Sequence, residues 1–512
     1  MNVGALLVNT AGKFPDATAI VAGGTRLSFR ELDERTRRLA SALLAAGLRP
    51  GDAVGMLFYN TVPMVEAYFA TVRAGLVAVP INFRLAGREM AFMLDDSGAK
   101  AFFYDPEFDP VIAGIRDGLD QLRFLVSPGP GPSGLARDYE QFLAGGRAGA
   151  ADPEGIAEDH PCQIMYTSGT TGRPKGAVIT HRNVIWNLFN TIQGREDRNG
   201  QVSIIVGPLY HTAALNNHLT IQVALGGTAV LVKNFDAEGL LATIERERAT
   251  VISGSPAMYN LLMQHPAAGR YDTSSITKCT AGADKLAMET KRRLMEFFPN
   301  IDGVYDVYGC TEASPCIAIL AARDSLRKDA SIGPPLPFLQ ARIMDEMGRF
   351  LGPDQVGELV CRGPNVMRGY HNNPQGTAEA IIDGWLHTGD LARMDDEGYL
   401  YIVDRKKDMI VSGGENIYPR ELEEVLYTHP EIADAAVVGL PDEVWGESVC
   451  AFVALKPGSG LGSEEVVELC KANLASYKKP KRVEFLDEIP RNPSGKVLKV
   501  ELRRQWLDKS TN

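Results

Sequence analysis

The sequence predicts an α/β protein with a large N-terminal domain and a small α+β domain at its C-terminus. Apolar strands alternate with amphipathic helices in two successive blocks, the pattern of βαβ units that form a largely parallel sheet. Residues 333–401 change to short strands with Gly and Pro turns, which indicates a β-rich subdomain. A charged, glycine-rich stretch then precedes a tail of about a hundred residues, a size typical of one folding unit. We therefore expect one domain at residues 1–404 and a second at 405–512.

The first βαβ block begins with a capped helix. Ser28 and Glu31 have the spacing of a capping box, and Gly47 and Pro50 are expected to end the helix that they open. The alternation that follows predicts strands at 53–59, 76–81 and 101–104, and helices at 62–74 and 89–94.

The second block and the tail continue the pattern. With 512 residues, the chain is too long for a single ordinary core. The second block is expected to contain strands at 163–166, 202–206, 228–232, 250–252 and 277–281, with helices between them. The tail is expected to contain helices at 419–427 and 464–474 and strands at 435–438 and 448–455.

Composition excludes several classes of protein. A formal net charge of −11 argues against broad nucleic-acid binding, which requires a basic face. Seven dispersed cysteines without C-x-x-C spacing indicate reduced thiols, as in a cytoplasmic protein, and neither a disulfide framework nor a zinc site. Neither a signal peptide nor a transmembrane segment is expected. The sequence leaves a homodimer open.

Residues 166–176 (YTSGTTGRPKG) follow an apolar strand and favour phosphate binding. Glycines and small hydroxyl residues allow backbone N–H groups to close around an anion, and Lys175 supplies a positive charge. The spacing is not that of a Walker A loop, because Gly176 stands where Ser or Thr is required. Pro174 would also disturb a helix beginning there. A flexible surface loop is the alternative interpretation of such a composition.

The full string resembles the phosphate loop of the adenylate-forming enzymes, which include acyl-CoA synthetases, luciferases and peptide-synthetase adenylation domains. Four further segments are similar to motifs of that family, in the family's order: 308–312 (YGCTE), 384–390 (GWLHTGD), 404–416 (DRKKD…SGGEN) and 490–496 (PRNPSGK). The resemblance implies that a carboxylate and ATP give an acyl-adenylate and pyrophosphate. CoA then accepts the acyl group, and AMP is released. ATP, Mg²⁺ and CoA are the expected cofactor and co-substrates.

Roles in nucleotide and metal binding come from this resemblance. The expected ATP- or AMP-binding residues are Thr167, Ser168, Gly169, Thr170, Thr171, Gly172, Gly282, Ala283, Asp306, Tyr308, Gly309, Thr311, Asp390 and Arg405. Glu312 and the Thr167 hydroxyl are the expected magnesium ligands. Asp390 is expected to accept hydrogen bonds from both ribose hydroxyls, and Tyr308 to stack on adenine.

Catalysis is expected to depend on Lys496, His211, Glu312 and Lys175, with Lys496 bridging the carboxylate and the α-phosphate. By the same resemblance the C-terminal domain is mobile, and Lys407 is its hinge. The expected CoA tunnel is formed by Ser412, Gly413 and Gly414. The expected acyl pocket is formed by His211, Leu215, Asn217, Met258, Cys310 and Ser314.

Several alternatives stay open. An enzyme that loads a carrier protein, a non-catalytic nucleotide-binding protein and an oxygen-using luciferase are rival functions on the same fold. Fatty, aryl and short branched acids are all candidate substrates. The last motif also resembles the recognition sequence of acetyltransferases, so acetylation of Lys496 is a further hypothesis.

Overall fold

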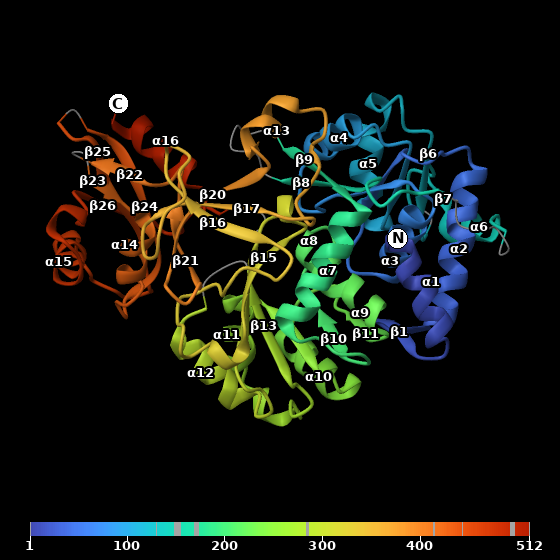
Figure 1. The fold of residues 1–512 in the computed structure, drawn as a ribbon, viewed down its shortest axis with the longest axis horizontal. Coiled ribbons are helices and arrows are strands. Elements are labelled where there is room, and N and C mark those ends of the chain that lie inside the picture. The colour runs from blue at the N-terminus through green and yellow to red at the C-terminus, as the bar shows by residue number, and fades with distance from the viewer. Residues whose placement is uncertain are drawn as a thin grey trace. The chain divides into compact units, whose positions relative to one another are not determined.

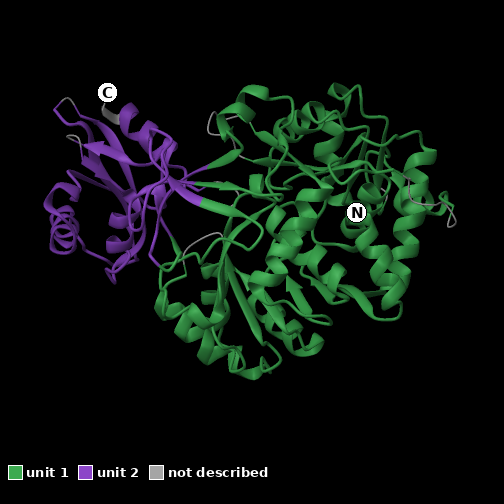
Figure 2. Cartoon of the chain, in the orientation of Figure 1, with its two compact units in different colours: residues 1–341, 360–387, 397–400 green, residues 342–359, 388–396, 401–512 purple. Residues whose placement is uncertain are grey.

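The computed structural model describes residues 2–129, 131–147, 155–167, 174–282, 286–412, 415–442, 444–491 and 497–510. Contacts divide the chain into two compact units (Figure 2). Unit 1 comprises residues 1–341, 360–387 and 397–400, and unit 2 comprises residues 342–359, 388–396 and 401–512. The proposed functional boundary at residue 405 falls inside unit 2, which also takes in two earlier segments.

The first sheet of unit 1 contains eight strands in the order β18-β9-β8-β4-β3-β5-β6-β7. Its strands are β3 (Ala53–Leu57), β4 (Val77–Pro80), β5 (Ala101–Tyr104), β6 (Phe124–Ser127), β7 (Arg137–Asp138), β8 (Pro161–Thr167), β9 (Lys175–Thr180) and β18 (Gly369–Tyr370). Strands β3 to β8 pair in parallel, whereas β9 pairs with β8 and with β18 in antiparallel. The parallel core of the sheet is what βαβ units produce.

The second sheet of unit 1 also contains eight strands, in the order β15-β14-β13-β12-β10-β11-β1-β2. Its strands are β1 (Thr18–Ala22), β2 (Thr25–Ser28), β10 (Val202–Ile205), β11 (Thr228–Leu231), β12 (Val251–Gly254), β13 (Lys278–Gly282), β14 (Val304–Gly309) and β15 (Cys316–Leu320). The two edge strands, β2 and β15, are antiparallel to their neighbours, and the rest pair in parallel.

Helices cover these sheets (Figure 1). Those of unit 1 are α1 (Val3–Lys13), α2 (Phe29–Ala45), α3 (Val62–Arg73), α4 (Gly87–Asp96), α5 (Asp109–Ile115), α6 (Tyr139–Ala144), α7 (His181–Arg195), α8 (Thr212–Ala214), α9 (Thr220–Leu225), α10 (Ala237–Glu247), α11 (Pro256–Gln264), α12 (Met288–Phe297) and α13 (Pro374–Ala380). Short 3₁₀ turns lie at Pro106–Phe108, Arg116–Gly118, Ala268–Arg270, Thr311–Ala313 and Ala322–Asp324, and a π-helical turn lies at Leu215–Leu219.

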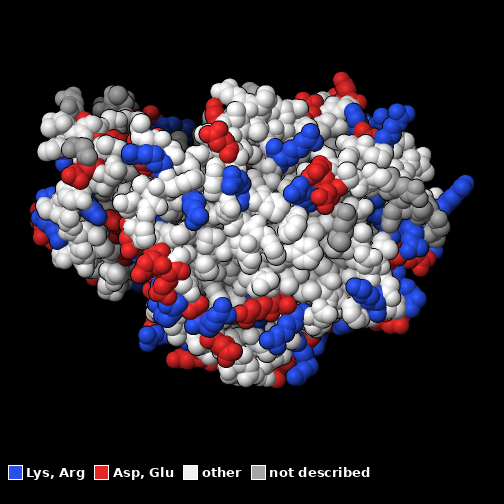
Figure 3. Space-filling view, in the orientation of Figure 1, with Lys and Arg blue, Asp and Glu red and all other residues white. Residues whose placement is uncertain are grey.

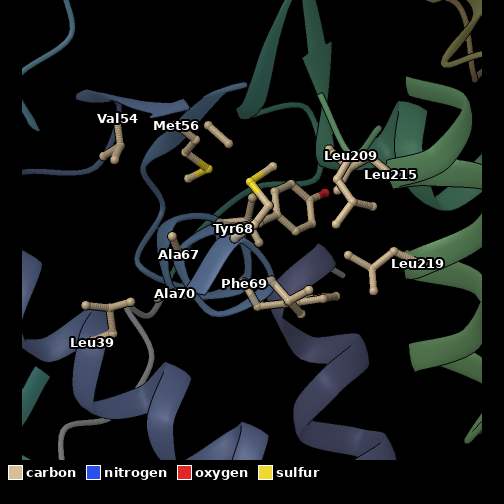
Figure 4. Close-up of a cluster of buried hydrophobic side chains, with 14 of the residues drawn as sticks. Leu39, Val54, Met56, Ala67, Tyr68, Phe69, Ala70, Leu209, Leu215 and Leu219 are labelled. Atoms are coloured by element: carbon tan, nitrogen blue, oxygen red, sulfur yellow. The ribbon is translucent and has the colours of Figure 1, made fainter. Parts of the chain in front are cut away.

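One hydrophobic core joins the two sheets of unit 1. Val54 and Met56 of β3 face this core, while their neighbours Ala53 and Leu57 face a second core on the other side, as the two-residue period of a strand requires. Figure 4 shows the middle of the shared core, where Leu209, Leu215 and Leu219 point toward Tyr68 and Phe69 of α3. A third core packs α10, α11 and α12 against the second sheet.

Unit 2 is a smaller α+β body. Its main sheet has the order β23-β22-β25-β24, with β26 paired to β25. The elements are β22 (Ile410–Ser412), β23 (Glu415–Ile417), α14 (Pro419–Leu426), β24 (Ile432–Asp442), β25 (Gly446–Leu455), α15 (Ser463–Asn473), the 3₁₀ turn Ser476–Lys478, β26 (Arg482–Phe485) and α16 (Lys499–Ser510). Alternate residues of β24 face two cores, one against α14 and α15 and the other against α16.

A third set of strands contains residues of both units. They are β16 (Gln340–Met344), β17 (Gly357–Arg362), β19 (Ile381–Ile382), β20 (Trp385–Met394) and β21 (Leu400–Arg405). These short strands correspond to the β-rich subdomain expected from the sequence.

The predicted fold class is confirmed, with differences in detail. The capping box at Ser28 and Glu31 is present at the start of α2. Helix α1 was not predicted, because its apolar run, Ala5–Val8, is only four residues long. Asn2 caps it by accepting from the Ala5 N–H at 2.9 Å. Strand β24 extends well beyond the predicted 435–438. No helix among the described residues is long and apolar enough to span a bilayer.

Candidate active site

The predicted phosphate loop connects two antiparallel strands of unit 1. Thr167 ends β8 and pairs with Lys175, the first residue of β9, so the residue after Pro174 begins a strand and not a helix. The Lys175 ammonium lies 5.3 Å from the centre of the Tyr370 ring. The predicted nucleotide ligands Ser168, Gly169, Thr170, Thr171 and Gly172 lie outside the described residues. The hairpin therefore fixes both ends of the loop.

A hollow lies beside this hairpin. Its volume is about 290 Å³, and its lining includes Phe92, Asp96, Lys175 and His371. Tyr166, at the end of β8, donates from its hydroxyl to Asp96 Oδ2 at 2.6 Å. The start of the loop is thus held against α4 next to an open space.

Glu312 lies just after β14 in a 3₁₀ turn. The Tyr370 hydroxyl donates to Glu312 Oε1 at 2.8 Å, and the Met367 N–H donates to the Glu312 carbonyl at 2.7 Å. Burial, together with the neighbouring Glu312 carboxylate, raises the pKa of Tyr370, so its phenol stays a proton donor at neutral pH. Tyr370 was not predicted as a site residue, because 58 residues separate it from Glu312.

The donor set around Glu312 suits magnesium. No group of three or more His, Cys, Asp or Glu side chains that would make an all-protein metal cage occurs in the part of the chain that the structure describes. Mg²⁺ is usually held by one or two carboxylates and by substrate phosphates, and it keeps several waters. A single carboxylate, joined through Tyr370 to the neighbourhood of Lys175, fits that mode of binding.

Adjacent parallel strands bring the predicted adenine-binding residues together. Gly282 ends β13 and pairs with Val307 of β14, one residue before Tyr308. A Cβ atom at Gly282 would lie 3.1 Å from the Val307 carbonyl oxygen, so the chain is close-packed there. Carboxyl ends of parallel strands are where α/β proteins bind ligands. Ala283 lies outside the described residues.

Asp306, another predicted nucleotide residue, already has a cationic partner. Its Oδ2 lies 2.6 Å from the Lys291 ammonium, which is 1% exposed and also donates to the Ser325 carbonyl at 3.2 Å. Burial raises the pKa of Asp306, and Lys291 opposes that rise. Lys291 was not identified from the sequence.

The residues predicted to line the acyl pocket differ widely in exposure. His211 is exposed, with its ring 4.5 Å from that of Tyr210, and Cys310 is partly exposed. The others are buried: Leu215, Asn217, Met258 and Ser314. The Thr311 hydroxyl, next to Cys310, lies 3.5 Å from that of Thr212, next to His211, so the two less buried positions belong to neighbouring turns of chain.

Leu215 and Asn217 lie in the π-helical turn, which widens one turn of a helix. Such turns are common at functional sites. The Asn217 side chain accepts from Asn187 Nδ2 at 2.8 Å and donates to Cys316 Sγ at 3.0 Å. The structure therefore gives Asn217 partners in the protein interior.

In unit 2, Asp390 and Arg405 form an ion pair. Arg405 Nε lies 2.7 Å from Asp390 Oδ1, and the two side chains are 50% and 9% exposed. Glu358 holds strand β20 just before Asp390, because it accepts from the Gly389 N–H at 3.1 Å and from Lys406 Nζ at 2.9 Å.

The predicted hinge begins with an anchored residue. Asp404 accepts from the backbone N–H groups of Arg405 at 2.6 Å and Arg420 at 2.9 Å, and burial raises the pKa of its carboxyl. Lys407 is exposed, and Ser412 ends β22. The remaining predicted residues of this region, Gly413, Gly414 and Lys496, lie outside the described residues.

Comparisons with known proteins agree with the predicted family. The model of the AMP-binding enzymes matches residues 7–371, and that of the AMP-binding enzyme C-terminal domain matches residues 421–496. A feruloyl-CoA synthase from Amycolatopsis is 40% identical over 98% of this chain and 99% of its own length. An indoleacetate–CoA ligase from Aromatoleum aromaticum is 38% identical over 96% of each chain.

Solved structures share the whole fold. The crystal structure of ATP-bound MatB from Rhodopseudomonas palustris has a TM-score of 0.88 and 32% identity, covering 99% of both chains. A Mycobacterium tuberculosis fatty acyl-CoA synthetase has a TM-score of 0.80 and 33% identity over 99% of this chain and 98% of its own. With the family models, the full-length relatives and the shared fold in agreement, the chain belongs to the adenylate-forming AMP-binding enzymes and is an ATP-dependent carboxylic acid:CoA ligase.

Proposed function

We propose that this ligase activates an aryl or arylalkyl carboxylic acid. The observation that carries the proposal is that the feruloyl-CoA and indoleacetate relatives, at 40% and 38% identity, both take acids with an aromatic ring. The ligases described as acting on long-chain fatty acids are 33–34% identical over a similar share of the chain. The greater likeness to the aryl-acid enzymes favours an aromatic acyl group.

The first half-reaction joins two anions, so its catalysis consists of positioning and charge neutralisation. The acid's carboxylate oxygen bonds to the α-phosphorus of ATP, and pyrophosphate leaves. Lys175 binds the phosphates, and Lys496 contacts both the carboxylate and the α-phosphate. Mg²⁺, when bound, neutralises phosphate charge. Glu312 and the Thr167 hydroxyl would hold it. Tyr370 orients the Glu312 carboxylate by its hydrogen bond of 2.8 Å.

Nucleotide contacts complete this step. Asp390 accepts hydrogen bonds from the ribose hydroxyls, and Arg405, its ion-pair partner at 2.7 Å, contacts the nucleotide. Tyr308 stacks on adenine next to the close-packed Gly282. Asp306 acts by fixing the β14 strand through Lys291, as its buried pair at 2.6 Å supports.

In the second half-reaction, the CoA sulfur attacks the acyl carbonyl and AMP leaves. Ser412, Gly413 and Gly414 allow the pantetheine arm to pass close to the backbone. His211, exposed beside Tyr210, borders both the thiol route and the acid. The exposed Lys407 is the hinge that exchanges the two arrangements of a mobile C-terminal domain at residues 405–512.

The cellular setting is proposed as the cytoplasm. All seven cysteines are free thiols, as a reducing compartment maintains them. Burial raises the pKa of the Cys361 and Cys279 thiols to about 12, so they stay protonated.

The described side chains on the face drawn in Figure 3 mix both signs of charge and form no broad basic surface for nucleic acid. Sedimentation velocity would test for a homodimer.

A pyrophosphate-release screen tests the substrate class. The purified enzyme is given ATP, Mg²⁺ and one acid at a time from a panel of cinnamic, arylacetic, benzoic, short branched and fatty acids, with and without CoA. We expect the largest kcat/KM for an aromatic acid, and acyl-CoA formation only with CoA. A higher kcat/KM for a fatty or branched acid would contradict the proposed class. Transfer to a holo acyl-carrier protein in preference to CoA would contradict the proposed acceptor.

A further inference from the structure

Buried amide side chains of unit 1 converge on residues 313–316, immediately after Glu312. We call this segment the post-Glu312 segment. The amides, which we call the asparagine set, are Asn187, Asn216, Asn217 and Asn365. Each member is at most 2% exposed.

Asn365 holds both ends of the segment. Its single Nδ2 group donates to the Ala313 carbonyl and to the Cys316 carbonyl, each at 2.8 Å. The same turn of chain also carries Met367, whose N–H donates to the Glu312 carbonyl at 2.7 Å. The backbone of Glu312 and the segment after it are therefore bound to one neighbouring turn.

Asn216 holds the middle of the segment. Its Nδ2 donates to the Ser314 carbonyl at 3.3 Å. Its amide also forms a reciprocal pair with Gln163 of β8, with bonds of 2.8 Å and 3.1 Å. Asn216 thereby links the π-helical turn to the strand that leads into the phosphate loop.

Asn187 and Asn217 hold the end of the segment. Asn187 Oδ1 accepts from the Cys316 N–H at 3.0 Å, and Asn217 Nδ2 donates to Cys316 Sγ at 3.0 Å. The two asparagines also bond to each other at 2.8 Å.

Side chains are needed here because the β14–β15 ladder is interrupted. Its register shifts between Tyr308 and Gly309, and Ser314 has a φ of 68°, outside the extended region. Buried carbonyl and N–H groups require partners, and leaving one without a partner costs about 1–3 kcal/mol. The asparagine set supplies these partners where the sheet does not.

We propose that the asparagine set positions Glu312 for adenylation by fixing the backbone on its C-terminal side. We class them as positioning residues, because the hydrogen bonds on which the proposal rests are made to the post-Glu312 segment. The inference rests on the proposed role of Glu312 as the magnesium ligand. A misplacement of about 1 Å at a catalytic group can cost about 10²-fold in rate, so a loosened segment should lower adenylation strongly.

The test compares Asn365→Ala with Asn190→Ala. Asn190 is also fully buried, and its Oδ1 accepts from the Phe338 N–H at 2.9 Å, away from the post-Glu312 segment. ATP–pyrophosphate exchange is measured against Mg²⁺ concentration with the acid found in the screen. For Asn365→Ala we expect roughly a tenfold rise in the half-saturating Mg²⁺ and a loss in kcat of roughly 10–10²-fold. The KM for the acid should change by less than about twofold. Asn190→Ala should change the half-saturating Mg²⁺, the kcat and the KM for the acid by no more than about twofold. Its loss in Tm should be similar to that of Asn365→Ala.

Two outcomes separate the inference from the role on which it rests. Glu312→Gln should raise the half-saturating Mg²⁺; if it does not, the proposed role of Glu312 and this inference both fail. If it does, while Asn365→Ala matches Asn190→Ala, the positioning inference alone is overturned. Should Asn365→Ala not fold, Asn216→Ala is measured in the same way and is expected to show the same Mg²⁺ shift.

Discussion

Each unit contains a carboxylate–cation pair at a residue predicted to bind the nucleotide, and the two pairs differ in exposure. In unit 1, Lys291 and Asp306 lie 2.6 Å apart with side chains 1% and 15% exposed. In unit 2, Arg405 and Asp390 lie 2.7 Å apart, and Arg405 is 50% exposed. A buried cation is committed to its carboxylate, whereas an exposed one can exchange its partner for a ligand. The distances are nearly equal, so the difference in exposure decides the interpretation. It points to a structural pair in unit 1 and a pair that responds to a ligand in unit 2.

The largest expected effect comes from breaking the buried pair. Lys291→Met keeps the apolar stem but leaves the Asp306 carboxylate without its cation, which should lower the free energy of unfolding by roughly 3–5 kcal/mol. Urea unfolding measures the change. The loss should be smaller at about pH 5 than at about pH 7, because the pKa of Asp306 is already raised by burial and the carboxyl takes up a proton. Adding Asp306→Asn should restore part of the stability; no restoration would show that the pair is not the cause.

The next largest effect is expected on the adenylation rate when Lys496 of unit 2 is replaced. Lys496→Ala should lower the adenylation rate by roughly 10²–10³-fold, by analogy with the loss of one oxyanion donor. Thiol transfer from supplied acyl-adenylate should change little, because the α-phosphate bond is already made. The measurements are pyrophosphate exchange and single-turnover acyl-CoA formation. Equal loss of both half-reactions would contradict a role for Lys496 confined to the first.

Local signals explain what could be predicted from the sequence. The Ser28 capping box and the strand at Ala101–Tyr104 were predicted correctly, because caps and apolar runs are encoded by neighbouring residues. The fold class and family were also predicted, since the motifs are contiguous strings. Tyr370 and Lys291 were missed because they reach Glu312 and Asp306 across the fold, where no periodicity connects them. The antiparallel pairing of β9 with β8 was missed because loop composition does not specify which strands pair.

A buried histidine makes unit 1 sensitive to acid. His181 Nδ1 accepts from the Val3 N–H at 3.0 Å, and burial lowers the pKa of His181 to about 3. Its pKa in an unfolded chain is about 6.5, so below that pH the unfolded state binds the proton more tightly and stability falls. From about pH 7.5 to about pH 5.5 the loss from this residue should be about 1.4 kcal/mol. Urea unfolding of His181→Gln should show a shallower fall over that range. An unchanged pH dependence would exclude His181 as a source of the acid sensitivity.

The smallest expected change in stability is at the exposed pair of unit 2. Arg405→Ala should alter the free energy of unfolding by less than about 1 kcal/mol, since a half-exposed ion pair contributes little. The KM for ATP should nevertheless rise roughly fivefold, because the proposed nucleotide contact is lost. Lys406→Ala is the matched control: Lys406 is 48% exposed and pairs with Glu358 at 2.9 Å, so it should have the same small effect on stability and leave the KM for ATP unchanged. If Arg405→Ala destabilised the protein as much as Lys291→Met, the exposed pair would be structural after all, and the contrast between the two units would not hold. A rise in the KM for ATP without loss of stability would instead identify Arg405 as a cation that binds the nucleotide.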